Sequence, residues 1–167
     1  HAALSGFEND GERDFDISAY NFPTEEVSGD YYDWVQSYDD QIGIVIADVS
    51  GKGVPAALLM AFLRASLRAA SHIGYAPHIS MSKVNYLLWE SIERNQFVTA
   101  FYGILDATNR TLAYSNAGHN PPFLIDANGD AHFEERGGVH SPRFAMKLPS
   151  VIALKEFIPM ARRPAFT

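Results

Sequence analysis

The sequence predicts an α+β fold whose strands and helices form layers. Three strand-like segments come before the first helix, two helices follow each other directly, and strands return after the second helix. A parallel doubly wound sheet would instead alternate strand and helix along the chain. With 167 residues, of which 47% are hydrophobic, the chain is long enough to bury one apolar core without disulfides.

The first three strands are predicted from side-chain alternation and from short apolar runs. Apolar and polar residues alternate over 14–22, which is typical of a strand with one buried face. The next two predicted strands, 31–37 and 41–48, are separated by the polar residues 38–40 and form a hairpin. Because hairpin strands are antiparallel, the start of the first and the end of the second lie at the same edge of the sheet.

Two helices are predicted after this hairpin. Pro55 suits the first turn of a helix that ends near residue 72 and carries apolar side chains on one face. Arg64 and Arg68 lie off that face and are interpreted as a solvated edge. The second helix is expected over about 80–94, with Ser80 as its N-cap.

Three more strands are predicted after the helices. They are 99–106, 111–115 and 123–125, the last of them before an Asn128-Gly129 turn. Strands on both sides of a helical pair favour antiparallel sheets over a parallel one.

Composition excludes several classes of protein. The net charge of −7 at pH 7 argues against a nucleic-acid-binding surface, which needs clustered Lys and Arg. The absence of cysteine excludes disulfides, thiolate zinc sites and cysteine nucleophiles, and it fits a cytoplasmic protein. No apolar run reaches the roughly 20 residues that cross a bilayer, and no signal peptide is recognisable, so we expect no membrane span.

Two aspartates are the candidate metal ligands. Asp30 and Asp48 each close a short apolar or aromatic stretch beside a glycine-containing turn. The predicted hairpin places them at one end of the sheet, where two carboxylates repel each other unless a cation lies nearby. A lone Gly-Asp usually only caps a turn, but the pair favours a site for a hard divalent cation such as Mg²⁺ or Mn²⁺.

Four segments of the chain resemble one protein family and occur in that family's order. They are 26–33 (EVSGDYYD), 48–57 (DVSGKGVPAA), 99–103 (TAFYG) and 116–122 (NAGHNPP). Together they resemble the SpoIIE-type branch of the metal-dependent protein serine/threonine phosphatases, which regulates sigma factors. The resemblance covers roughly residues 14–138.

The resemblance implies a four-layer αββα sandwich, in which two antiparallel β-sheets are flanked by helices. It also implies a centre of two Mn²⁺ or Mg²⁺ ions, in which Asp30 binds one ion, Asp48 bridges both and Val49 contributes its backbone carbonyl. Asp30 and Asp48 are then the catalytic residues because they hold the ions, and a hydroxide that bridges the ions attacks phosphorus. No nucleophilic side chain is required, which suits a chain without cysteine.

Weaker candidates surround these ligands. Glu26 and Asp33 either orient metal-bound waters or are acids that face solvent. Gly51 and Gly53 let the backbone pass close to the metal centre and enter the following helix. His119 is conceivable as a general acid, although its segment is better interpreted as a rigid turn that leaves a strand.

The C-terminal part departs from the family. The family normally supplies further carboxylate ligands from an Asp-Gly turn after the segment that corresponds to Gly137-Gly138, and no Asp-Gly follows here. We expect a single phosphatase-like domain over 1–167, in which 139–167 is an atypical or truncated C-terminal part. Because a centre short of one or two carboxylates binds its metals weakly, we expect the activity of this chain to be weak or lost.

Three functions are compatible with the sequence. The leading one is a metal-dependent phosphatase that acts on phosphoserine or phosphothreonine of a bacterial regulatory protein, by resemblance an anti-sigma-factor antagonist. The alternative is a catalytically impaired phosphatase-like regulatory module that binds a phosphoprotein. A third takes Asp48 as the phosphoacceptor of a receiver domain, which the order of the elements disfavours. The resemblance also implies a sensory or receiver domain N-terminal in the full-length protein, and a homodimer.

Overall fold

The computed structural model describes residues 2–5, 8–9, 12–13, 16–19, 30–36, 41–92, 96–106, 111–125 and 131–133. The chain divides into two compact units: His1–Tyr20, Pro121–Arg136 and Ser150–Thr167 form one, and Asn21–Asn120 with Gly137–Pro149 form the other. That residues 1–167 form a single domain stays a prediction. The expected turns at 38–40 and Asn128-Gly129, Glu26, and the tail 139–167 lie outside the described residues.

The larger unit is built on a four-stranded antiparallel sheet. Its strands, in their order across the sheet, are β5 (Asp30–Gln36), β6 (Gln41–Val49), β7 (Val98–Asp106) and β8 (Thr111–Ala117). The predicted hairpin is confirmed as β5 and β6, and the two predicted strands after the helices are confirmed as β7 and β8. A receiver domain needs a parallel sheet, so the interpretation of Asp48 as its phosphoacceptor is wrong.

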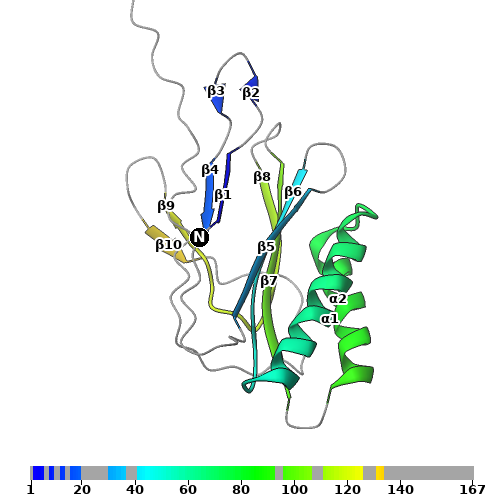
Figure 1. Cartoon of the computed structure of the whole chain (residues 1–167). Coiled ribbons are helices and arrows are strands. Elements are labelled where there is room, and N and C mark those ends of the chain that lie inside the picture. The colour runs from blue at the N-terminus through cyan, green and yellow to red at the C-terminus, as the bar shows by residue number, and fades with distance from the viewer. Residues whose placement is uncertain are drawn as a thin grey trace, which may run out of the picture. The chain divides into compact units, whose positions relative to one another are not determined.

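Two helices cover one face of this sheet (Figure 1). As predicted, α1 (Val54–Ser71) has Pro55 in its first turn, and α2 (Pro77–Ser91) follows after a turn in which Gly74 has a φ of 73°. The predicted start of α2 was wrong. Pro77 occupies the first turn, where its missing amide costs nothing, and Ser80 is fully buried inside the helix instead of capping it.

The core of this unit lies between the sheet and the two helices. Every second side chain of β6 and β7 points toward the helices, among them Val45, Ala47 and Tyr102. They form one buried cluster with Leu63 and Leu67 of α1 and with apolar residues of α2. The opposite face of the sheet is apolar and buried as well. Its buried apolar side chains outside the helix-side cluster include Ile42, Ile44, Ile46, Phe101 and Leu105.

The apolar composition of α1 follows from this packing. By length and composition alone α1 could cross a membrane, which the sequence analysis did not predict. In the structure one face of α1, with Leu59, Leu63 and Leu67, is buried in the core. A helix in this position is apolar because it covers a sheet.

The smaller unit consists of two-stranded antiparallel pairs. These are β1 (Ala2–Ser5) with β4 (Asp16–Ala19), β2 (Glu8–Asn9) with β3 (Glu12–Arg13), and β9 (Phe123–Ile125) with β10 (Ala131–Phe133). β4 lies within the predicted strand 14–22, and β9 confirms the one at 123–125. The described residues therefore give an α+β fold with one four-stranded antiparallel sheet and two helices.

Truncation of Leu67 tests the packing of α1. Leu67 is 1% exposed in the core, so Leu67→Ala is expected to lower the free energy of unfolding by about 2–5 kcal/mol, because a buried cavity replaces packed methyl groups. Leu58, on the same helix, is 67% exposed, and Leu58→Ala is expected to change it by no more than about 0.5 kcal/mol. Urea unfolding followed by circular dichroism measures both, and equal losses would contradict the placement of α1.

Candidate metal centre

Asp30 and Asp48 lie directly opposite each other at one end of the four-stranded sheet. Asp30 is the first residue of β5, Asp48 is the last but one of β6, and their Cα atoms are partners in the strand register. Directly opposed residues of antiparallel strands share a face, with their Cβ atoms about 5 Å apart. The prediction that the hairpin brings these two side chains together is confirmed, whereas their role as metal ligands stays a prediction.

The carboxylate pair lies on the face of the sheet away from the helices. Ala47 and Val49, the neighbours of Asp48 along β6, belong to the helix-side core. Because successive side chains of a strand point to opposite faces, Asp48 and its partner Asp30 point away from α1 and α2.

Charge repulsion is built into this pair. Burial raises the pKa of Asp48, and the negative charge of Asp30 raises it further. Both residues are only partly exposed, so water does not fully screen the two charges. A cation bound between them would remove the cost of keeping both carboxylates ionised.

Thr99 and His119 extend this row of polar groups across the sheet. Thr99 on β7 is the register partner of Asp48, is 2% exposed, and its Oγ1 lies 3.1 Å from Nδ1 of His119. Burial lowers the pKa of His119, while the charge of Asp30 acts in the opposite direction. The imidazole is therefore neutral at neutral pH and has no proton of low pKa to give to a leaving group, which disfavours the general-acid role. Thr99 was not among the predicted site residues, although it is the first residue of the TAFYG motif.

The turn that carries His119 is held by hydrogen bonds to Asn116. The Asn116 Oδ1 accepts a hydrogen bond from the His119 amide at 2.8 Å, and its Nδ2 donates to the His119 carbonyl at 2.9 Å. Between them Gly118 has a φ of 72°, which favours glycine. These contacts confirm the predicted rigid turn, and they fix the position of the His119 backbone from which the imidazole extends.

The turn from β6 into α1 brings backbone groups to the same edge. The Ser50 amide donates to the Phe97 carbonyl on the β7 side at 2.9 Å. Successive strand residues direct their backbone groups to alternate sides, so the Val49 carbonyl points toward β5. Gly51 and Gly53 have φ values of 92° and 72°, so this turn requires residues without a side chain.

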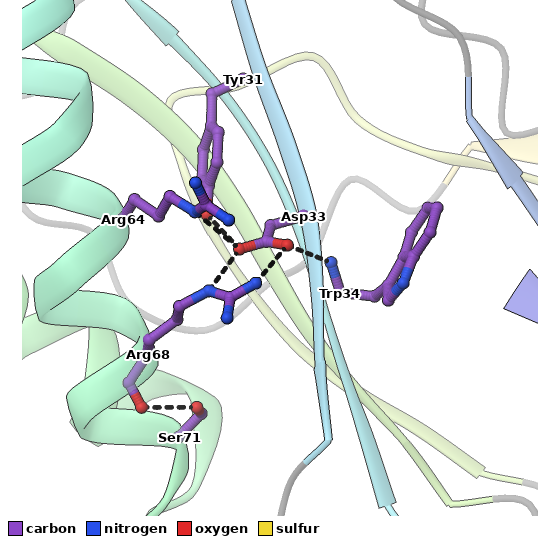
Figure 2. Close-up of polar contacts among 6 residues, drawn as sticks. All are labelled: Tyr31, Asp33, Trp34, Arg64, Arg68 and Ser71. Atoms are coloured by element: carbon purple, nitrogen blue, oxygen red, sulfur yellow. Dashed lines mark hydrogen bonds and ion pairs between the residues drawn. The ribbon is translucent and has the colours of Figure 1, made fainter. Parts of the chain in front are cut away.

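Asp33 has a different environment from the one predicted. It lies on the helix face of β5, and it accepts hydrogen bonds from Arg68 Nε at 2.7 Å and Nη2 at 2.8 Å (Figure 2). The Tyr31 hydroxyl donates to it at 2.7 Å. Asp33 is therefore neither a solvent-facing acid nor a group beside the Asp30 carboxylate, and the interpretation of Arg68 as a solvated edge was wrong. Both errors have one cause: helical and strand periodicity do not reveal which side chains meet across two elements.

Comparison with known proteins identifies the family. Residues 38–140 match the family described as Stage II sporulation protein E (SpoIIE), and this match includes β6, both helices, β7 and β8. The chain belongs to the SpoIIE family. The resemblance based on the four sequence motifs is thereby confirmed.

Three relatives of this SpoIIE-family chain are Phosphoserine phosphatase RsbU of Bacillus subtilis (strain 168), Protein IcfG of Synechocystis sp. and Phosphoserine phosphatase RsbP of Bacillus subtilis (strain 168). They are 31%, 32% and 30% identical to it over 74%, 70% and 70% of its length. The chain spans only 36%, 23% and 30% of these relatives.

Two solved structures share the fold of this SpoIIE-family chain. The RsbU and RsbW domains of Rv1364c from Mycobacterium tuberculosis match with a TM-score of 0.62 and 30% identity, over 71% of this chain and 34% of that one. The SpoIIE phosphatase domain from Bacillus subtilis matches with a TM-score of 0.51 and 14% identity, over 92% of this chain and 58% of that one. The second likeness shows the fold alone.

The donors in this SpoIIE-family chain fit a hard divalent cation. Within the part of the chain that the structure describes, no three His, Cys, Asp or Glu side chains gather into a metal-binding group. The acidic groups that the strand register brings together at this edge are the oxygen donors Asp30 and Asp48, and the alternation of backbone groups directs the Val49 carbonyl toward the β5 side. Oxygen donors of this kind suit Mg²⁺ or Mn²⁺, whose remaining positions are commonly filled by water or by substrate phosphate. The repulsion between the Asp30 and Asp48 carboxylates also favours a bound cation.

Binding of Mn²⁺ tests this assignment without an activity assay. The melting temperature of the wild type is expected to rise with MnCl₂, since a ligand at about 100 times its Kd stabilises the folded state by about 2.7 kcal/mol. Asp48→Asn should abolish this rise. In EDTA the same variant should be at least as stable as the wild type, because the substitution removes the repulsion from Asp30. An equal Mn²⁺-induced rise in both proteins would contradict the assignment.

Proposed function

We propose that this chain is the phosphatase part of a longer protein, and that it hydrolyses phosphoserine or phosphothreonine on a regulatory protein with the help of bound Mn²⁺ or Mg²⁺. The observation that carries the proposal is the register pairing of Asp30 with Asp48 in a chain of the SpoIIE family. Two of the relatives are named phosphoserine phosphatases, and the chain covers about a third of each. The pair and the family together favour metal-assisted hydrolysis.

Asp30 and Asp48 would hold the cations in this function, with the Val49 carbonyl as a third oxygen donor. When bound, two divalent cations supply Lewis acidity for the phosphoryl group and lower the pKa of water. The carboxylates come from two strands that are already paired, so their separation is set by the fold before any ion binds. That preorganisation lowers the cost of assembling the site.

Neighbouring groups of the chain suit an anionic substrate. The first turn of α1 begins at Val54, directly after the glycine turn, and contains no acidic residue. Its N-cap residue is Gly53, which has no side chain to cap the helix. The amides of this first turn favour negative charge at this end of the helix. The neutral imidazole of His119, held by Thr99, can exchange a hydrogen bond with an ester or phosphoryl oxygen without changing the charge of the site.

The four-layer sandwich is part of the same proposal. Ile42, Ile44, Ile46, Phe101 and Leu105 are buried on the sheet face that the helices do not cover. An apolar sheet face of this kind requires a second layer, and a second antiparallel sheet is the layer that an αββα sandwich supplies. The carboxylate pair would then lie at one end of the space between the two sheets.

The substrate class is inferred from the relatives. RsbU and RsbP are described as phosphoserine phosphatases, and the Mycobacterium tuberculosis protein carries RsbU and RsbW domains in one chain. We infer that the substrate of this chain is a phosphorylated protein of a sigma-factor-regulating system, of the anti-sigma-factor antagonist type. An N-terminal sensory or receiver domain, a homodimer and a cytoplasmic location stay predictions.

Hydrolysis of a phosphoserine peptide tests the proposed activity. Phosphate release is expected to require Mn²⁺ or Mg²⁺ and to fall by at least about 100-fold in Asp48→Asn, because removal of a metal-binding group takes away most of the electrostatic stabilisation of the transition state. Asp106→Asn is the matched control. Asp106 also lies on this sheet, at the opposite end, where its Oδ2 accepts a hydrogen bond from Gln41 Nε2 at 3.1 Å, and its substitution should leave phosphate release within about twofold.

The same assay separates the phosphatase from the impaired regulatory module. One observation favours the module. Among the described residues, Asp30 and Asp48 are the two acidic groups at this edge, and no third one joins them. The module predicts that the chain binds a phosphoserine protein in the presence of Mn²⁺ but releases no phosphate even at millimolar Mn²⁺. Turnover that disappears in Asp48→Asn would exclude the module, whereas turnover unaffected by Asp48→Asn would refute the metal mechanism.

A further inference from the structure

An ion pair joins α1 to β5 on the face of the sheet opposite the carboxylate pair. The Arg68 guanidinium donates two hydrogen bonds to Asp33, from Nε at 2.7 Å and from Nη2 at 2.8 Å, and Figure 2 shows it reaching from the helix to the strand. Arg64, one turn earlier on α1, places its Nε 3.4 Å from the same carboxylate. A bidentate contact of this kind fixes both distance and orientation.

The Asp33 carboxylate is held from several directions. Besides the two arginines, the Tyr31 hydroxyl donates to Oδ2 at 2.7 Å and the Trp34 amide donates to Oδ1 at 3.0 Å. The side chain of Asp33 is 12% exposed. Burial alone would raise its pKa, but the hydrogen bonds from Arg68 and Tyr31 and the arginine charges outweigh burial and lower the pKa. Asp33 is therefore ionised at neutral pH and locked in one orientation.

This ion pair connects the two elements that carry the candidate ligands. Asp33 lies three residues after Asp30 on β5, and Arg68 lies on the helix that begins at Val54, just after Asp48 and the glycine turn. One path from Asp30 to Asp48 runs through the strand pairing of β5 with β6. The second path runs along β5 to Asp33, across the ion pair to Arg68, and back along α1 to the glycine turn.

The apolar core specifies the orientation of α1 less directly than the ion pair does. Leu59, Leu63 and Leu67 hold α1 on the sheet, but the hydrophobic effect is non-directional, whereas a bidentate ion pair adds geometric specificity. Apart from the adjacent residues of the chain, nothing lies within 4 Å of where a Cβ would stand at Gly51 or Gly53, so no packed neighbour fixes the glycine turn at these two positions. The Arg68 side chain is 43% exposed, and partly exposed ion pairs contribute little to stability. The pair therefore contributes orientation more than stability.

We propose that Asp33 and Arg68 are positioning residues for the metal centre: their ion pair sets α1 against β5 and thereby keeps the glycine turn, the Val49 carbonyl and Asp48 in register with Asp30. The inference rests on the proposed metal centre. It means that residues on the opposite face of the sheet affect how tightly this centre binds metal. Both residues act from the helix face of the sheet, away from the face that carries Asp30 and Asp48.

Mn²⁺ affinity of two single variants tests the proposal. Asp33→Asn removes the charge, and Arg68→Lys keeps the charge but loses the planar bidentate contact. Titration calorimetry with MnCl₂ is expected to show an affinity about tenfold lower than wild type in each, the usual size of effect for residues that orient metal ligands. The Mn²⁺ affinity of the double variant should be no lower than that of either single variant, because the two residues act through one contact. Asp106→Asn, the matched carboxylate control, should bind Mn²⁺ like the wild type.

Two further measurements separate positioning from a merely structural role. Urea midpoints of Arg68→Lys and the wild type should nearly coincide, and phosphate release by both variants should return toward the wild-type rate when Mn²⁺ is raised about tenfold, in proportion to the loss of affinity. Wild-type Mn²⁺ affinity in Arg68→Lys, or a loss of affinity that merely follows a loss of folded protein, would overturn the proposal while leaving the metal centre intact. A wild type that binds no Mn²⁺ would overturn both.

Discussion

The register between β5 and β6 is the constraint on which the rest of the structure depends. It sets Asp30 opposite Asp48, and it also directs Ala47 and Val49 into the core beneath the helices. Because side chains alternate with a period of two, a slip of one residue in β6 would turn Asp48 into the apolar core and separate the pair. Core and site are thus selected together, and the apolar packing that stabilises the fold also holds two like charges side by side.

The two faces of the four-stranded sheet carry aspartates in different electrostatic environments. On one face Asp33 has its charge compensated by arginines, and its pKa is lowered. On the other face burial raises the pKa of Asp48, and the negative charge of Asp30 raises it further. Two aspartates of the same hairpin therefore differ because of their partners: one is satisfied by the protein, whereas the other is best satisfied by a bound cation.

Local signals in the sequence predicted the hairpin, the place of Pro55 in the first turn of α1 and the meeting of Asp30 with Asp48, since each depends on short-range periodicity or on turn residues. The contact of Asp33 with Arg68 could not be predicted, because it joins positions 35 residues apart and depends on how a helix packs on a sheet. Ser80 was misread as a cap because Ser suits that position in isolation, whereas Pro77 starts the helix one turn earlier. Thr99 could be recognised as a site residue only from its register with Asp48 in the sheet.

A metal centre built on Asp30 and Asp48, the two carboxylates that the described residues place at this edge, would depend strongly on their positions. Two acids oppose four positive charges if two divalent cations bind, so water and the phosphoryl oxygens of a substrate must supply much of the remaining coordination. Metal and phosphorylated substrate then favour each other's binding, because each completes the environment of the other. In such a site a small change in the separation of Asp30 and Asp48 would not be compensated by another carboxylate from the described residues. The pairing of β5 with β6 and the contacts that hold the following helix on the sheet would therefore matter for the chemistry of the proposed site as well as for the stability of the fold.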